Sequence, residues 1–243
     1  MSGTVIISAA TQGELSLMLK ALGGRTSETA GGFPSWETES GDGSVILAVT
    51  GMGKINAAAA TAVLIERHAP ALLINTGCAG VFPDNCLAVG DLALASVEIC
   101  ADEGVLDPTG WLSFEGLGIP AVERKGKRYF NEFPLSLAAA EKAVRLAAVL
   151  GIPLTRGKFL TVSTCSGTAE RGRELFQRYG ALCENMEGAA VAQVALRYGV
   201  DCLEVRGISN LVEDRDPSRW NIPLAVERAQ RFLLKFISAW NGE

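Results

Sequence analysis

The sequence predicts an α/β fold, a single-domain three-layer sandwich in which helices flank a central mixed, mainly parallel sheet. The first observation is that short runs of Val, Ile and Leu, bounded by Gly, Pro or Asp, alternate with longer helical segments. The second is that 243 residues suit one large α/β unit, and neither a repeat nor a low-complexity linker divides them. We therefore expect one domain over residues 1–243.

The strands and helices can be placed by the spacing of apolar residues. Short runs rich in β-branched residues predict buried strands at Val5–Ala9, 44–50, 71–77, 91–101, 158–163 and 202–208. Longer segments predict helices at 54–68, 135–150, 168–179, 187–198 and 222–240. In the last of these, apolar residues recur at spacings of three and four, which gives the helix one apolar face.

The segment 102–133 interrupts this alternation. It is rich in glycine and contains four aromatic residues, Trp111, Phe114, Tyr129 and Phe130. A structureless loop of this length is usually functional or disordered, and the aromatic residues favour an ordered excursion near a ligand. We interpret the basic residues at positions 124, 125, 127 and 128 as a solvated surface run.

Charge and composition argue against several classes of function. The formal net charge is −5 and the chain has no run rich in Lys and Arg, so we expect no nucleic-acid and no anionic-membrane partner. The apolar run 87–99 is interrupted by Gly90, Asp91 and Glu98 and cannot span a bilayer. The N-terminus has no basic segment before a long apolar core, so we expect a cytoplasmic protein.

Cysteine and histidine usage narrows the chemistry. The six cysteines form no C-x-x-C pair, and we expect reduced, buried thiols. His68, the single histidine, lies near a helix end, where it is expected to compensate the helix dipole. One histidine argues against zinc and against a Ser-His-Asp or Cys-His site. Acid–base chemistry then falls to carboxylates, Lys, Tyr or amides, and we expect neither a metal nor a cofactor.

Two glycine-rich motifs follow expected strands. TGMGK (50–54) opens a helix, a context that suits an anion or polar ligand, but its spacing matches neither a Walker A loop nor a dinucleotide fingerprint. NTGCAG (75–80) is expected to end the next strand. Each motif alone is equally explained by a tight structural turn. Together they indicate a small-molecule crevice, because open α/β sheets bind ligands at the carboxyl ends of neighbouring strands.

Charged and amide side chains follow the same strand ends. Glu14 comes after the first strand, Arg206 and Asn210 come at the end of the last, and Glu187 lies in the first turn of a helix. Glu187 alone is explained by a favourable interaction with the helix dipole. The combination predicts that all four side chains converge on one pocket.

These motifs carry a resemblance to a known family. The pattern AAT-x-x-E, TGMGK, NTGCAG, ENMEGAA and RGISN, in this order between about Val5 and Phe236, resembles the nucleoside phosphorylase/hydrolase superfamily. Within it the chain looks like the futalosine hydrolase family, relatives of the methylthioadenosine/S-adenosylhomocysteine nucleosidases. The resemblance implies a phosphorylase/hydrolase-like fold and hydrolysis of futalosine to hypoxanthine and dehypoxanthine futalosine, in menaquinone biosynthesis.

The resemblance also implies roles by position. Met186 and Glu187 match the family's ribose clamp, in which the carboxylate accepts from the sugar 2′- and 3′-hydroxyls. Glu14 matches the carboxylate that orients and deprotonates the attacking water, and Arg206 its partner at that water. Asn210 matches the position that binds the purine N7 edge.

Four further residues are expected to bind substrate. Cys78 and Gly80 belong to the NTGCAG motif, and the base-stacking residue is expected between Thr164 and Thr168. The nucleosidases usually carry Ser where this chain has Cys78, so their hydroxyl contact is not transferred to this chain.

The chemistry of N-glycosidic cleavage fits these residue types. The reaction builds positive charge on the sugar, which a carboxylate stabilises, and negative charge on the base, which an N–H donor stabilises. Hypoxanthine presents two acceptors, O6 and N7, which suit the two N–H groups of the Asn210 amide, whereas an ionised Asp would repel O6. The adenine-specific nucleosidases carry Asp here, so Asn210 favours a 6-oxopurine.

Other functions remain open at this stage. A phosphorylase needs several Arg or Lys groups around an oxyanion, but the first 66 residues contain one arginine, Arg25, and Glu14 would repel phosphate. Hydrolysis is therefore favoured over a purine nucleoside phosphorylase. An adenine-releasing methylthioadenosine/S-adenosylhomocysteine or aminodeoxyfutalosine nucleosidase is an alternative, as is a non-catalytic nucleoside-binding module. The resemblance implies a homo-oligomer, most simply a dimer.

Overall fold

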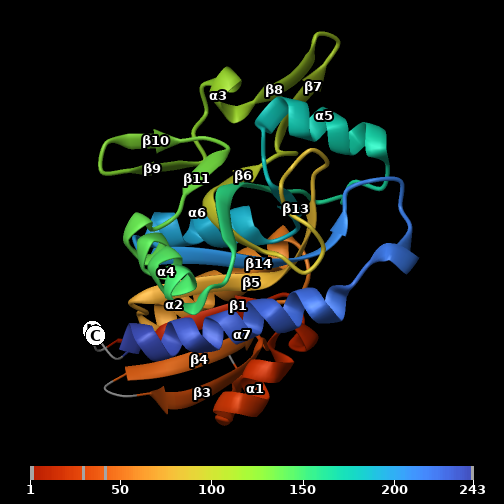
Figure 1. Cartoon of the computed structure of the whole chain (residues 1–243). Helices are drawn as coiled ribbons and strands as arrows, with labels where there is room; N and C mark the ends of the chain where they lie inside the picture. The colour runs from red at the N-terminus through yellow and green to blue at the C-terminus, as the bar shows by residue number, and fades with distance from the viewer. Residues whose placement is uncertain (1–2, 29–30, 41–42, 242–243) are drawn as a thin grey trace.

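The computed structural model describes residues 3–28, 31–40 and 43–241. Its centre is a ten-stranded mixed sheet (Figure 1). The strands of this sheet are β1 (Val5–Ala9), β2 (Arg25–Glu28), β3 (Pro34–Ser40), β4 (Gly43–Val49), β5 (Leu72–Val81), β6 (Leu92–Cys100), β11 (Glu132–Pro134), β12 (Leu154–Thr161), β13 (Cys183–Asn185) and β14 (Asp201–Leu211). They follow the order β11-β6-β12-β13-β5-β1-β4-β3-β2, and β14 pairs with both β5 and β6.

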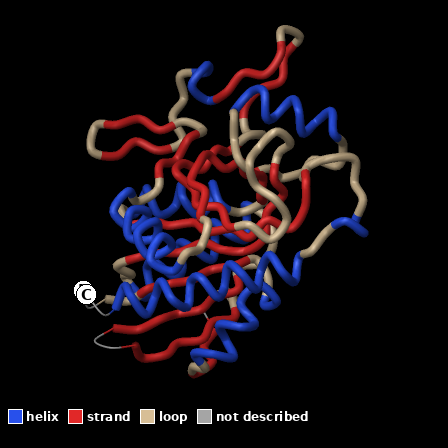
Figure 2. Tube along the Cα trace, in the orientation of Figure 1, coloured by secondary structure: helices blue, strands red, loops and turns tan. Residues whose placement is uncertain are grey.

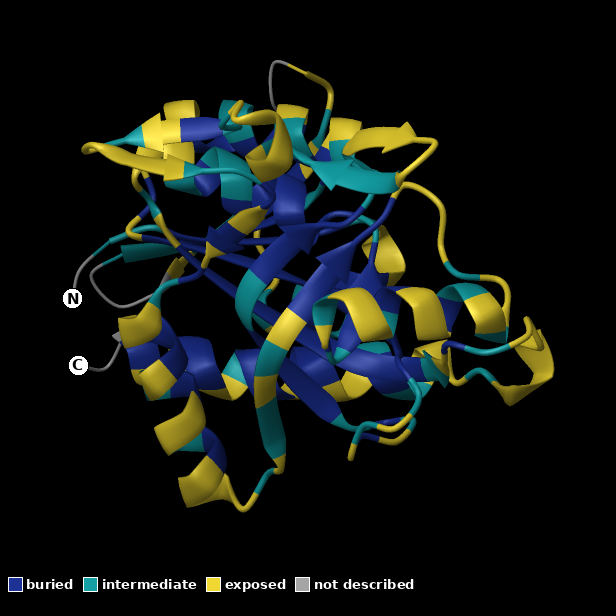
Figure 3. Cartoon of the chain, turned by 90° about the horizontal axis from the view of Figure 1, so that it is seen from above, coloured by how far each residue is buried: buried dark blue, intermediate teal, exposed yellow. Residues whose placement is uncertain are grey.

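Helices cover both faces of the sheet (Figures 1 and 2). On one face lie η1 (Gln12–Leu15), α1 (Ser16–Leu22), α4 (Leu137–Leu150) and α7 (Ile222–Asn241), and on the other lie α2 (Lys54–His68) and α6 (Gly188–Tyr198). The alternation of side chains along a strand explains this arrangement. Val5 and Ile7 of β1 pack in the same cluster as Phe232 of α7, whereas Ile6 packs with Leu64 of α2. Figure 3 shows the buried strands between these exposed helical surfaces.

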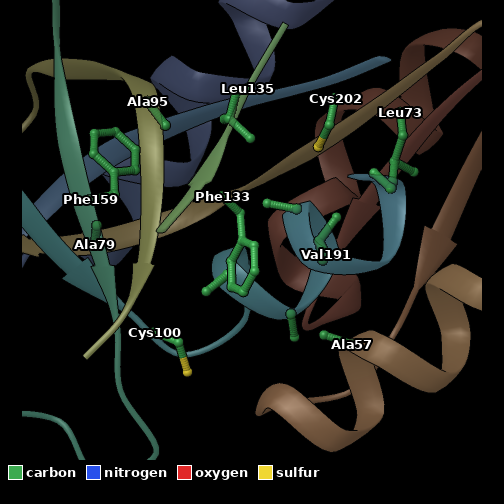
Figure 4. Packing of buried hydrophobic residues seen from close by; sticks show 14 of the residues in the cluster. Ala57, Leu73, Ala79, Ala95, Cys100, Phe133, Leu135, Phe159, Val191 and Cys202 are labelled. Atoms are coloured by element: carbon green, nitrogen blue, oxygen red, sulfur yellow. The ribbon is translucent and has the colours of Figure 1, made fainter. Parts of the chain in front are cut away.

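The cluster beneath α6 fixes that helix on the sheet. Figure 4 shows Phe133 of β11 against the helix that carries Val191, with Phe159 and Leu135 nearby. Phe133 is 1% exposed, and burying an aromatic side chain of this kind contributes about 2–3 kcal/mol. Because α6 begins beside the candidate site, this packing also positions the start of the helix.

The expected three-layer sandwich is wrong for the central layer. β14 pairs with β5 in parallel and with β6 in antiparallel orientation, and β12 joins β6 to β13, which returns antiparallel to β5. Five strands therefore close into a ring, β5-β14-β6-β12-β13, beside the open part of the sheet. The mixed sheet and the flanking helices are as predicted. The ring was missed because pairing between distant strands leaves little trace in local sequence patterns.

Most predicted elements are present with small shifts. The strand at β1 and the helix at α2 match residue for residue. The helices expected from Thr168 and Glu187 begin one residue later, because each of these residues is the N-cap: α5 spans Ala169–Tyr179 and α6 starts at Gly188. NTGCAG (75–80) is not a turn, since β5 continues through it to Val81 with β13 and β14 paired on its two sides.

The excursion is ordered, as predicted. It forms the hairpin β7 (Gly104–Asp107) and β8 (Gly110–Ser113), the short helix α3 (Phe114–Leu117), and a second hairpin, β9 (Val122–Arg124) with β10 (Lys127–Tyr129). In Figure 1 the first hairpin and α3 project at the top of the molecule, and the β9–β10 hairpin projects at the upper left. Lys125, Lys127 and Arg128 are exposed, which agrees with a solvated run. The edge strand β2 and its neighbour β3 were missed because their polar sequences lack the apolar runs used as a guide.

The thiols are only partly as expected. The six cysteines are free, and Cys100, Cys183 and Cys202 are buried, but Cys86 and Cys165 are exposed. The expectation of uniform burial is therefore wrong for these two. His68 is the last residue of α2, as the sequence predicted. Within the described ranges, no helix is long and apolar enough to cross a bilayer.

A close backbone contact between the sheet and α7 gives a test of the fold. Gly207 of β14 lies against the backbone of Ala225, so that a Cβ at position 207 would overlap the Ala225 carbonyl oxygen. We expect Gly207→Ala to push α7 away and to lower the free energy of unfolding by about 2–3 kcal/mol, measured by chemical denaturation. Gly167→Ala is the control, because no other atom lies within 4 Å of its Cβ position. Equal stability of the two variants would contradict this account of the packing.

Candidate active site

The structure brings three of the four predicted charged and amide side chains into one buried cluster. Glu14 of η1, Glu187 at the start of α6 and Arg206 of β14 are each less than a tenth exposed. Nη2 of Arg206 lies 3.6 Å from Oε2 of Glu187. Glu14 and Arg206 meet over Gly77, where an added Cβ would overlap the carboxylate and crowd the guanidinium. Gly77 therefore has to lack a side chain for this pair to approach.

Glu14 is held by the way the chain leaves β1. Thr11 caps the short helix η1, and its backbone N–H and hydroxyl both donate to Oε2 of Glu14, each at 3.0 Å. The backbone N–H of Cys78 donates to Oε1 at 3.1 Å. Three hydrogen bonds from two segments fix the carboxylate, while two oxygens can accept about four. An accepting position is left for water or a substrate hydroxyl.

Glu187 is set by two loops. The Asn185 side chain accepts from the backbone N–H groups of Glu187 and Gly188, at 2.9 and 2.7 Å, which fixes the turn into α6. The backbone N–H of Gly53 donates to Oε1 of Glu187 at 3.0 Å. Burial raises the pKa of the Glu187 carboxyl above its ordinary value, and the charge of Arg206 partly offsets this effect.

The TGMGK loop is joined to the candidate site through Glu187. Gly51 and Gly53 have φ of +86° and +91°, a conformation that favours glycine, and the loop leads from β4 into α2 as predicted. The backbone N–H of Gly53 in this loop donates to the carboxylate of Glu187. The loop thus shapes the site by holding a side chain.

Arg206 lies beneath the carboxylates with 1% of its surface exposed. Its Nε donates to Oε1 of Glu204 at 2.8 Å, and Nη1 donates to the Cys78 carbonyl at 3.3 Å. Nη2 has no hydrogen-bond partner in the described part of the chain. Burial lowers the pKa of the guanidinium, but the charges of Glu204 and Glu187 outweigh burial and raise it. Arg206 is therefore a permanent cation with one N–H group still to satisfy.

Asn210 lies apart from this cluster, beside Gly80 of β5. Its Nδ2 is the nearest atom to a Cβ built on Gly80, at 3.0 Å. The Ser209 hydroxyl donates to Oδ1 at 2.7 Å, and Nδ2 donates to the Leu211 carbonyl at 3.0 Å. These bonds fix the orientation of the amide. One of its two Nδ2 hydrogens is used within the chain, so one is left for a ligand, whereas the sequence suggested two.

Of the other predicted substrate residues, Met186, Gly80 and Cys78 lie next to residues of the candidate site. Met186 is half-buried beside Glu187, and Gly80 is the register partner of Asn210. Cys78 contributes its backbone N–H and carbonyl to Glu14 and Arg206. Burial raises the pKa of the Cys78 thiol to about 11, so this group stays protonated at neutral pH.

The segment expected to stack on a base is exposed. The Thr168 hydroxyl accepts from the Arg171 N–H at 3.2 Å and caps α5. No hydrogen bond or ion pair joins Thr168 or Thr164 to the carboxylate cluster among the described contacts. The structure therefore gives Thr168 a capping role, and the prediction that this segment stacks on a base stays a prediction.

Glu184 is a further carboxylate near the site. It is 5% exposed and accepts from the backbone N–H of Ser166 at 2.8 Å and from its hydroxyl at 2.7 Å. Glu184 and Asn210 are the register partners of Gly80 on its two sides. Burial raises the pKa of Glu184. Glu184 stands in the ENMEGAA motif, but nothing in a single sequence separates it from its neighbours.

The arrangement combines three capacities. Glu14 offers a fixed carboxylate that can accept a proton, Glu187 offers one that can accept from hydroxyl groups, and Asn210 offers an N–H donor at the far end. A fixed base, a fixed anion and a fixed donor suit a reaction in which water attacks a carbon that is becoming positive.

Comparisons with known proteins agree with this chemistry. A model of the phosphorylase superfamily matches residues 4–238. The futalosine hydrolase of Thermus thermophilus is 34% identical over 210 residues, covering 86% of this chain and 88% of the relative. The 5′-methylthioadenosine/S-adenosylhomocysteine nucleosidase of Shewanella halifaxensis is 30% identical over 217 residues, covering 87% of each chain.

The fold has counterparts among solved structures. A structure of a futalosine hydrolase mutant of Helicobacter pylori superimposes with a TM-score of 0.83 at 21% identity, covering 97% of this chain and 99% of that chain. At this level of identity the similarity concerns the fold. It includes the course of the chain through both the open part of the sheet and the ring.

Proposed function

The chain belongs to the phosphorylase superfamily, and on that premise we propose that it hydrolyses the N-glycosidic bond of futalosine, releasing hypoxanthine and dehypoxanthine futalosine in menaquinone biosynthesis. Two kinds of relative bear on this choice, since both futalosine hydrolases and 5′-methylthioadenosine/S-adenosylhomocysteine nucleosidases are similar to the chain. Both names describe enzymes that cut a nucleoside bond with water. The proposal thus concerns which base and which sugar substituent are accepted.

The observation that carries the proposal is the pairing of a fixed carboxylate at Glu14 with a fixed amide at Asn210. In the proposed reaction Glu14 takes a proton from water as it attacks the anomeric carbon. Glu187 accepts from the ribose hydroxyls, and its negative charge stabilises the developing positive charge on the sugar. The free Nδ2 hydrogen of Asn210 stabilises the departing base at N7 or O6.

Two features favour a 6-oxopurine. Ser209 holds Oδ1 of Asn210, so the side chain presents a donor, and hypoxanthine offers acceptors at O6 and N7. An adenine N6 group is itself a donor and cannot accept from the free Nδ2 hydrogen, whereas the O6 of hypoxanthine can. The nucleosidase alternative rests on the relatives at 30% identity, and Asn210 is the residue that argues against it.

The charge of the cluster favours water over phosphate. Arg206 is matched by Glu204 at 2.8 Å and lies 3.6 Å from Glu187, with Glu14 close by. The one cation is thus outnumbered by carboxylates. A phosphate dianion placed here would meet net repulsion, so we propose hydrolysis and not phosphorolysis.

The domain organisation and assembly that we propose for the molecule follow from the family match and from its exposed apolar residues. The family match over residues 4–238 supports one domain. Exposed apolar side chains on the excursion, Leu106 and Ile119, support contact with a second subunit, and we propose a homo-oligomer, most simply a dimer, acting in the cytoplasm without a metal or cofactor.

The reaction itself is the first test. Purified protein is expected to release free hypoxanthine from futalosine in phosphate-free buffer, followed by chromatography of the products. Inosine and methylthioadenosine, offered separately and with or without phosphate, are the comparison substrates. Strict dependence on phosphate would overturn hydrolysis, and faster cleavage of methylthioadenosine would overturn the choice of base.

Replacement of Glu14 tests the proton acceptor. We expect Glu14→Gln to reduce kcat by roughly 10²–10⁴ while KM changes little, because the amide cannot take the proton from water. The amide nitrogen also faces N–H donors of Thr11 or Cys78, so the melting temperature is measured alongside. Glu141→Gln, an exposed change on α4, is the control. Near-native turnover of Glu14→Gln would place the proton acceptor elsewhere.

Replacement of Asn210 tests the choice of base. In Asn210→Asp a carboxylate oxygen would face the Leu211 carbonyl and the O6 of hypoxanthine, so we expect kcat/KM for futalosine to fall about tenfold to a hundredfold. The ratio of kcat/KM for aminodeoxyfutalosine over futalosine should rise, most clearly at low pH where the carboxyl is protonated. Asn221→Asp, at an exposed cap of α7, is the control. A ratio unchanged at every pH would show that Asn210 does not select the purine 6-position.

A further inference from the structure

A second layer of polar groups lies beneath the candidate site. Glu98 of β6 is fully buried and Glu204 of β14 is 1% exposed. Thr161 of β12 and Asn185 of β13 donate to Glu98, so four of the five ring strands contribute to this layer. Glu204 in turn accepts from Nε of Arg206. This layer connects the ring strands to the active-site cation.

The hydrogen bonds of this layer are almost complete. Oε2 of Glu98 accepts from the Thr161 hydroxyl at 2.8 Å, and Oε1 accepts from Nδ2 of Asn185 at 2.6 Å. Oε1 of Glu204 accepts from Arg206 at 2.8 Å. Oε2 of Glu204, however, is buried and has no donor among the described groups. An unsatisfied buried carboxylate oxygen is strongly unfavourable, so this atom has to have a donor that heavy-atom positions do not reveal.

The missing donor is identified by position. A Cβ built on Gly188 would overlap both Oε1 of Glu98 and Oε2 of Glu204, so these two oxygens lie together beneath the start of α6. Two ionised carboxylates do not remain in contact in a buried site, since like charges at this range cannot both be supported. A single proton between them removes the repulsion and satisfies the orphan oxygen in one step.

We propose that Glu98 and Glu204 share one proton and act as a hydrogen-bonded pair with a single negative charge, which positions Arg206 beneath Glu14 and Glu187. Glu98 and Glu204 are thus positioning residues for the hydrolytic site, and this role rests on the proposed function. The proton bridges Oε1 of Glu98 and Oε2 of Glu204. With the proton on Glu204, Oε2 of Glu204 donates to Oε1 of Glu98, and with the proton on Glu98, Oε1 of Glu98 donates to Oε2 of Glu204, so in both cases every oxygen of the pair takes part in a hydrogen bond.

The electrostatics of the surroundings agree with one proton. Burial, and then the charge of Glu204, raise the pKa of Glu98 well above its ordinary value. The titratable groups that interact with the pair are Arg206, Glu187 and the thiols of Cys183 and Cys202, and Glu14 interacts in turn with Arg206 and Glu187. Burial raises the pKa of both thiols, so they remain neutral. Arg206 is the one cation in this group, and the shared proton limits the negative charge that it has to balance.

A shared proton predicts that replacing Glu204 with Gln changes activity little. In Glu204→Gln the amide oxygen can accept from Arg206 and the amide nitrogen can donate to Glu98, so every bond and the single charge of the pair survive. We expect kcat/KM within about threefold of the wild type, and an acid limb of the pH profile that does not move. Were both carboxylates ionised in the wild type, Glu204→Gln would remove a negative charge, lower the pKa of Glu187 and move the acid limb to lower pH.

The contrasting variant removes the acceptor. Glu204→Leu leaves Nε of Arg206 without a partner, and we expect kcat to fall by about tenfold or more with a smaller change in KM. The three proteins are assayed on whichever nucleoside the wild type cleaves, with Glu141→Gln as the control. A tenfold loss in Glu204→Gln, a shifted acid limb, or full activity in Glu204→Leu would each overturn the proposal.

Infrared spectroscopy tests the pair without any assay of activity. The wild type at neutral pH is expected to show the C=O absorption of a protonated, water-excluded carboxyl group, and Glu204→Gln is expected to lose one such absorption. Retention of the full absorption in the variant, or its absence from the wild type, would overturn the shared proton. If the wild type cleaves no nucleoside, the proposed function fails while this measurement still decides the proposal. It also decides if Glu204→Leu does not fold.

Discussion

The buried charge of Arg206 is the constraint on which the rest of the site depends. A guanidinium with 1% exposure has lost its hydration, and removing one partner of a buried ion pair typically costs about 3–5 kcal/mol. The chain therefore has to bring carboxylates to it, and they come from separate elements: Glu204 from the same strand and Glu187 from the start of α6. Glu14 completes the set from η1. The side chains proposed to hold water and sugar are thus the ones required to balance the cation.

The ring of five strands is what makes this convergence possible. In an open sheet β14 would have β5 on one side and a free edge or a second parallel neighbour on the other. Here β14 also pairs with β6, while β13 returns to β5, so Gly80 has Asn210 on one side and Glu184 on the other. β5 contributes glycine at positions 77 and 80, where side chains would fill the space that these groups share. The contribution of β5 to the site is the space left by two glycines that have no side chain.

The sequence predicted the parts of the site that follow local rules. The spacing of apolar residues predicts where strands end and helices begin. Glu14, Glu187 and Arg206 follow such ends, and groups at the carboxyl ends of neighbouring strands meet at one edge of a sheet, so their convergence could be predicted. The ring was beyond reach because β13 has three residues and its partners are far away in sequence. Glu204 was not predicted as a site residue because it stands within an apolar strand, and its partner Glu98 is far away in sequence. Thr168 was expected as the first residue of a helix and is instead the N-cap of α5, a role for which Thr is a favoured residue.

The two layers of carboxylates have different proposed roles: the upper layer binds water and sugar, and the deeper layer positions Arg206. Glu14 and Glu187 are the carboxylates that we propose meet the ligand, whereas Glu98 and Glu204 lie in the deeper layer, bonded to Thr161, Asn185 and Arg206. If Glu14 and Glu187 alone balanced the charge of Arg206, both would be tightly bonded to the guanidinium. They would then be poor acceptors for water or sugar hydroxyls. In the deeper layer Glu204 accepts the hydrogen bond from Nε of Arg206. The Nη2 atom of Arg206 has no hydrogen-bond partner among the described residues. It lies 3.6 Å from Oε2 of Glu187, which is too far for a hydrogen bond. Arg206 therefore keeps an N–H group near the Glu187 carboxylate that is available to a ligand of the proposed reaction.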